Sequence, residues 1–207
     1  MTAERAVGVG RRFGGTRVVI DTNVWISATL TQGGAPAAIV RCVLRSGLPV
    51  LTAETFAELE TRLRRPKFDR YLSLDLRRAI LRDLRACESI DSRLSGKRAS
   101  DSRWGKLLEF TSSSFGPQRK KQRTQRLESI DSQPLSAAAL WVAVAPGLAA
   151  RRFCRDADDD RFVHAALTAS AGWIISGDAD LLEMAPVAGL RVVTPAAAMA
   201  EALFANE

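Results

Sequence analysis

The sequence predicts an α/β fold with a doubly wound, mainly parallel sheet flanked by helices. Two observations support this prediction. Short runs of β-branched and other apolar residues, at positions 18–20 and 173–176, are typical of strands that are buried on both faces of a parallel sheet. Segments with apolar residues at helical spacing separate such runs, and strands that alternate with helices indicate a parallel sheet.

The chain is long enough for one domain of ordinary size, since 46% of its 207 residues are apolar. We expect this domain over residues 17–204, after a flexible extension at residues 1–16. We also expect a basic, disordered or loosely helical insertion at residues 91–132, which interrupts the domain. The net charge of +7 arises there, because residues 93–127 hold ten cations and two acids. The overall charge therefore does not indicate what the domain itself binds.

A direct repeat brackets the insertion. Residues 88–92 and residues 128–132 both read Glu-Ser-Ile-Asp-Ser. A five-residue identity at both edges of a segment rich in Ser, Lys, Arg and Gln favours an insertion with duplicated ends, and coincidence is the alternative. Its most basic run, residues 119–123, could hold phosphates or could be a solvated charge run.

The first half of the domain begins with the strand at 18–20 and a loop at 31–36. A helix at 37–46 follows, with Pro36 in its first turn and Gly47 after its end. A strand at 48–51 precedes a helix at 53–64 that Thr52 caps. Ser73 caps a further helix at 74–87, whose arginines are interpreted as its solvated face. These arginines are Arg77, Arg78, Arg82 and Arg85.

In the second half we expect strands at 141–144, 173–176 and 190–193. A helix at 161–170 precedes the second of them and ends at Gly172. The final helix is capped by Thr194 and has Pro195 at its first position.

Acids follow two of the predicted strands, and acids also begin or line two of the predicted helices. Asp21 and Asp178 follow strands, Glu58 lies within a helix, and Asp160 lies at the start of another. In a parallel sheet all four can meet at its carboxyl edge, where open α/β folds bind ligands. Such a cluster needs a cation, because like charges raise each other's pKa. Oxygen ligands alone favour a hard ion, Mg²⁺ or Mn²⁺, which can activate water for phosphodiester cleavage.

Taken together, these segments resemble the PIN domain, the nuclease fold of VapC-type toxins and of related RNA-processing nucleases. The resemblance covers about residues 17–88 and 141–204, in the family's order. The matching segments are residues 19–24, 51–54, 58–59, 65–68, 155–162, 176–181 and 193–195. The insertion departs from the family pattern, since family members pass directly to the next strand at that point.

The resemblance implies a metal-dependent endoribonuclease whose catalytic metal ligands are Asp21, Glu58, Asp160 and Asp178. It also implies that Asn23 orients the first ligand or contacts substrate. Asp156 is the main rival to Asp160. Thr22 and Asp180 are expected to lie beside the ligands. Asp158 and Asp159 are interpreted as acids that complement the helix dipole, and the only histidine, His164, as structural.

The implied role is the toxin of a type II toxin–antitoxin pair. The expected partners are an RNA substrate, a cognate antitoxin protein and a second copy of the chain. An odd number of widely spaced cysteines favours the reducing cytoplasm. No segment predicts export or membrane insertion.

Two other functions compete with this one. A haloacid-dehalogenase-like phosphatase also begins with a strand that ends in Asp, but it needs an acid two residues later, where this chain has Asn23. A catalytically impaired PIN module would bind nucleic acid or a protein partner without cleavage. The presence of all four acids argues against impairment, and the insertion argues for it.

Overall fold

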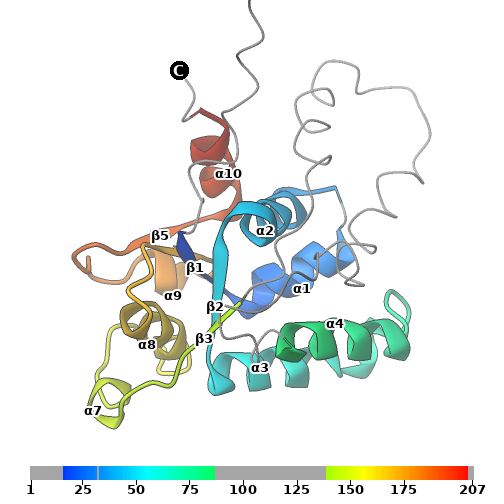
Figure 1. The fold of residues 1–207 in the computed structure, drawn as a ribbon, viewed down its shortest axis with the longest axis horizontal. Helices are drawn as coiled ribbons and strands as arrows, with labels where there is room; N and C mark the ends of the chain where they lie inside the picture. Colours follow the sequence, from blue (N-terminus) through cyan, green and yellow to red (C-terminus); the bar gives the residue numbers. More distant parts are fainter. Residues whose placement is uncertain (1–15, 32, 87–138, 205–207) are drawn as a thin grey trace, which may run out of the picture.

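The computed structural model of the protein describes residues 16–31, 33–86 and 139–204. Within them, five parallel strands form one sheet in the order β3-β2-β1-β4-β5, which confirms the predicted fold class (Figure 1). The strands are β1 (Arg17–Ile20), β2 (Leu48–Leu51), β3 (Leu140–Trp141), β4 (Trp173–Ile175) and β5 (Arg191–Val193). The predicted extension at 1–16, except for Thr16, and the predicted insertion at 91–132 lie outside the described residues.

Helices cover both faces of the sheet. Those in the first half of the chain are α1 (Thr22–Leu30), α2 (Ala35–Ser46), α3 (Ala53–Leu63), the 3-10 turn η1 (Pro66–Phe68) and α4 (Leu74–Ala86). The second half has α7 (Pro146–Ala149), α8 (Asp160–Thr168), α9 (Ala179–Leu182) and α10 (Pro195–Phe204). Within the described residues, no helix is both long enough and apolar enough to cross a membrane.

Alternation along the strands creates two apolar cores. Val18 and Ile20 point to the face that α1, α2 and α3 cover, whereas Val19 points to the opposite face. There it packs with residues of α8 such as Phe162 and Val163. Because β1 is buried on both faces, its three apolar residues in succession fit a central parallel strand.

Strand register fixes which residues emerge together at the carboxyl edge. In the parallel pairing of β1 with β4, Ile20 lies opposite Ile175. The backbone N–H of Asp21 continues this ladder by donating to the carbonyl of Ile175, at 3.0 Å. The residues that follow β1 and those that follow β4 therefore start side by side.

Most of the predicted helix boundaries are confirmed. Pro36 lies in the first turn of α2, and Gly47 caps its end. Thr52 caps α3, and its hydroxyl accepts a hydrogen bond from the backbone of Thr55 while the Thr55 hydroxyl accepts one from the backbone of Thr52. The strand predicted at 141–144 is shorter and begins one residue earlier, at Leu140.

The helix α1 was not predicted. Most of its side chains are buried, among them Val24, Trp25, Ile26 and Ala28, so the segment shows no alternation between an apolar and a polar face. Its β-branched residues also favour a strand when the sequence is considered alone. The short helix α9 was missed as well, because four residues are too few to establish a helical period.

Arg77 corrects the prediction of a solvated arginine face on α4. Its side chain is only 2% exposed, although Arg78, Arg82 and Arg85 are exposed as expected. The guanidinium donates to the carbonyls of Leu72 (2.8 and 3.0 Å) and Leu63 (3.0 Å), and it pairs with Asp69. Arg77 lies on the same face of the helix as Ile80 and Leu84, so its spacing predicts a buried position. Its charge favours a solvated position instead, which is why the sequence interpretation was wrong.

We expect Arg77→Met to lower the free energy of unfolding by about 3 kcal/mol, because several buried carbonyls and Asp69 lose their partner. Urea unfolding measures this change. The matched control is Arg78→Met on the same helix, which should alter stability by less than about 0.5 kcal/mol. Equal effects of the two substitutions would contradict a structural role for Arg77.

Candidate metal centre

Asp21 directly follows β1, at the carboxyl edge of the sheet. It caps the N-terminus of α1, where its Oδ1 accepts a hydrogen bond from the backbone N–H of Asn23 at 3.1 Å. Its Oδ2 accepts from the hydroxyl of Ser176 at 2.7 Å. The residue is 2% exposed. Burial raises the pKa of Asp21, and both hydrogen bonds together with the positive charge of Arg62 oppose that rise.

Ser176 links the acids that follow the two strands. It is fully buried after β4, donates to Asp21 and accepts a hydrogen bond from the backbone N–H of Asp178 at 2.9 Å. Asp178 in turn caps α9 by accepting from the N–H of Asp180 at 2.9 Å. The structure thus brings Asp21 and Asp178 together as predicted. Sequence reasoning gave Ser176 no role, because a serine after a strand is common.

A second group of acids adjoins this pair. Asp156, Asp159 and Asp180 each offer a carboxylate oxygen, and these oxygens lie within 4.8 Å of one another. Burial, followed by the charges of Asp178, Asp156, Asp21 and Asp180, raises the pKa of Asp159 to about 6. Asp159 therefore faces the shared acidic site, although the sequence interpretation assigned it only to the helix dipole.

The carboxylate of Asp160 is bound by groups of the loop that precedes α8. Its Oδ1 accepts hydrogen bonds from the backbone N–H groups of Phe153 (2.9 Å) and Cys154 (2.7 Å), and its Oδ2 pairs with Arg152 at 2.8 Å. The carboxylate is buried and fastens the loop before α8. The metal-ligand role that the resemblance implies for Asp160 stays a prediction, and its geometry is that of an acid already supplied with donors.

Three consecutive aspartates thus point in three directions at the start of α8. Asp158 and Asp159 lie in the turn before α8, and Asp160 is the first residue of that helix. Asp159 faces the acids, Asp160 faces the preceding loop, and Asp158 is 81% exposed and pairs with Arg161. Sequence alone could not distinguish them, because tertiary packing sets the path of the turn that leads into α8.

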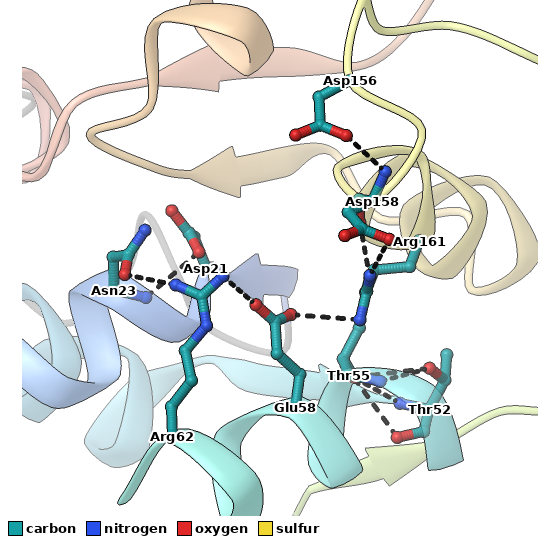
Figure 2. Close-up of polar contacts among 9 residues, drawn as sticks. All are labelled: Asp21, Asn23, Thr52, Thr55, Glu58, Arg62, Asp156, Asp158 and Arg161. Carbon is teal, nitrogen blue, oxygen red and sulfur yellow. Dashed lines mark hydrogen bonds and ion pairs between the residues drawn. The ribbon is translucent and has the colours of Figure 1, made fainter. Parts of the chain in front are cut away.

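Glu58 comes to the site from α3 and is held by two arginines (Figure 2). Its side chain is 11% exposed, and its Oε1 pairs with Arg62, one turn later, at 2.6 Å. Its Oε2 lies 3.5 Å from Arg161 and accepts no hydrogen bond. Arg62 also donates to the side-chain oxygen of Asn23, at 2.8 Å. The predicted residues Asn23 and Glu58 are therefore connected through one guanidinium.

The other predicted residues border this site. Thr22 is buried in the first turn of α1, and Asp180 forms an ion pair with Arg155. His164 is buried in α8, and its Nε2 lies 2.8 Å from the carbonyl of Arg151. That contact supports the structural interpretation of the histidine.

These residues fit a hard divalent cation. The group consists of carboxylates alone, and oxygen ligands are those that Mg²⁺ and Mn²⁺ prefer. The raised pKa values of Asp21 and Asp159 show that their negative charges are costly in the protein alone. A bound cation would remove that cost, because opposite charge stabilises the ionised form.

The raised pKa of Asp159 generates a prediction about stability. Its pKa is about 6 in the folded chain, against an ordinary value of 3.8, so the folded state holds this proton more tightly than the unfolded state does. The free energy of unfolding therefore falls as the pH rises between these two values, and the whole loss is present above the higher one. We expect Asp159→Asn to stabilise the protein at pH 7.5 in EDTA by about 1 kcal/mol, after allowance for solvent screening. The gain should vanish at pH 4. Urea unfolding at both pH values tests this, and a variant less stable than wild type at pH 7.5 would refute it.

Comparison with known proteins agrees with this geometry. A family model described as the PIN domain matches residues 17–180. No curated protein and no solved structure matches the chain. PIN domains are generally metal-dependent nucleases, and the matched region contains the acidic site at the carboxyl edge of the sheet. Because the match spans well over half of its length, the chain belongs to the PIN domain family, and its function is of the nuclease type.

Proposed function

We propose that the protein is an endoribonuclease that hydrolyses RNA phosphodiester bonds with Mg²⁺ or Mn²⁺. The observation that carries this proposal is the convergence of Asp21, Asp178 and Asp159 at one sheet edge, with two of the three carboxyl groups raised in pKa. Asp21 is buried and the other two acids are partly buried, so their mutual repulsion destabilises the ionised cluster unless it binds a cation.

In this proposal Asp21, Asp178 and Asp159 would hold the ion, and Glu58 would join them from α3. Asp159 replaces Asp160 in the ligand set that the resemblance implies, because Oδ1 of Asp160 already accepts two backbone hydrogen bonds and its Oδ2 pairs with Arg152. Asp156 and Asp180 complete the acidic rim.

The bound ion would supply a water of lowered pKa and would neutralise charge on the phosphate. The chain's own residues provide orientation. Ser176 fixes one oxygen of Asp21, and the Asn23 N–H fixes the other. Asp156, on the exposed side of the group, could accept a hydrogen bond from an attacking water. Such preorganisation means that little rearrangement is needed when substrate arrives.

The biological role that we propose is the toxin of a type II toxin–antitoxin system in the cytoplasm. Its partners would be an RNA substrate, a cognate antitoxin protein and a second copy of the chain. The support is the resemblance of the motif segments to VapC-type toxins, together with the family membership.

We expect Asp21→Asn and Asp159→Asn to reduce RNA cleavage in Mn²⁺ by roughly 100-fold or more, equivalent to about 3 kcal/mol in the barrier. Each removes a charge from the site. The matched control is Asp158→Asn, one residue before Asp159 but exposed to solvent, which should change the rate by less than about threefold. Gel analysis of structured and single-stranded RNA measures the rates.

Cleavage by Asp21→Asn at the wild-type rate would refute the carboxylate mechanism. Loss of cleavage in folded Asp160→Asn but not in Asp159→Asn would show that Asp160, and not Asp159, is the third metal ligand. If wild type retains RNA but does not cut it, the alternative of a binding module is favoured. Cleavage only after deletion of residues 93–127 would mean that this segment blocks an otherwise functional catalytic site.

A further inference from the structure

We infer that Arg62 is a built-in cation that competes with the divalent ion for Glu58. The inference rests on the proposed metal site. It assigns to Arg62 a role that neither the sequence motifs nor the family membership supplies. In this view the metal-free protein neutralises Glu58 with a guanidinium, and ion binding must displace that guanidinium.

The contacts of Arg62 bring its charge to the predicted site residues Glu58 and Asn23. One terminal nitrogen, Nη2, pairs with Oε1 of Glu58 at 2.6 Å, and the other, Nη1, donates to Oδ1 of Asn23 at 2.8 Å. Figure 2 shows the guanidinium between Asp21 and Asn23 on one side and Glu58 on the other. The same positive charge acts on Asp21. Arg62 thus satisfies oxygens from both α1 and α3.

The two arginines at Glu58 differ in how easily they can leave. Arg62 is 34% exposed and extends from α3 by a long side chain, so it can turn into solvent. Arg161 also pairs with Asp158 and donates to its carbonyl. We therefore expect Arg161 to keep Glu58 oriented whether or not Arg62 is in place.

Competition follows from electrostatics. A divalent ion bound through Glu58 would lie a few ångströms from the Arg62 guanidinium, and like charges at that distance repel each other in a partly buried site. Ion binding must therefore break the contacts of Arg62 with Glu58 and Asn23. By linkage, whatever stabilises those contacts weakens the binding of the ion, and a bound ion weakens the contacts by the same free energy.

The test compares Mn²⁺ dissociation constants of the full chain, measured by calorimetry at pH 7.5. We expect Arg62→Gln to tighten Mn²⁺ binding by about three- to tenfold, because a competing charge is removed. Arg62→Lys retains the charge and should bind Mn²⁺ within about twofold of wild type. The fold of each variant is checked by circular dichroism.

Arg64→Gln is the matched control. Arg64 lies two residues later, as the residue that caps the end of α3, and forms an ion pair of the same spacing and length, with Glu60 at 2.6 Å. Both pairs join residues one turn apart, but Arg64 lies away from the acidic site and beside α4. Arg64→Gln removes the same charge and the same kind of ion pair as Arg62→Gln, but away from the acidic site. Mn²⁺ binding should therefore change by less than about twofold.

Unchanged or weaker Mn²⁺ binding in Arg62→Gln overturns the inference, as does equal tightening in Arg64→Gln. The proposed metal site survives either result if wild-type binding is lost in Asp21→Asn. Absence of Mn²⁺ binding in both wild type and Arg62→Gln would instead contradict the metal site and the inference together. Binding that appears only in Arg62→Gln would support the inference in its strongest form.

Discussion

The pairing of β1 with β4 places Ile20 opposite Ile175, and the arrangement of the acids depends on this register. Asp21 and Ser176 emerge next to each other, so one hydroxyl can bind the carboxylate that follows the first strand and the N–H that precedes α9. A shift by one residue would turn Val18 and Ile20 towards the other core and would separate these groups. Burial of β1 on both faces thus positions the site as well as the sheet.

Charge at the site is divided between acids that already have partners and acids that do not. Asp160 has two backbone donors and Arg152, and Glu58 has two arginines. Asp159 has neighbouring acids instead, and its pKa is raised to about 6. Acids whose pKa is raised indicate where a cation would be stabilising, and Asp21 is such an acid even though it accepts two hydrogen bonds. This distinction leads us to favour Asp159 over Asp160 as a ligand.

The corner between α3 and α4 shows how the scaffold supports the site at a distance. Arg77 ties the end of α3, through the carbonyl of Leu63, to the turn at Leu72. At its other end α3 is fixed by the mutual hydrogen bonds of Thr52 and Thr55. Glu58 and Arg62 lie between these two anchors. Their position relative to α1 is therefore set by a rigid helix, so a contact such as that between Arg62 and Asn23 can be specific.

The sequence by itself determined the parallel α/β fold, the caps Thr52 and Gly47, and the meeting of Asp21 with Asp178. These features depend on local patterns: apolar runs, capping residues and the shared edge of parallel strands. It did not predict α1, because a helix buried on most sides has no amphipathic period. Only the tertiary structure decided that Asp159 lies beside other acids, whereas Asp160 binds the preceding loop. It likewise decided that Arg77 is buried, and that Arg62 bridges Asn23 and Glu58. Each of these depends on how a helix, or the turn that leads into it, packs against another element, and no local pattern of residues encodes that packing.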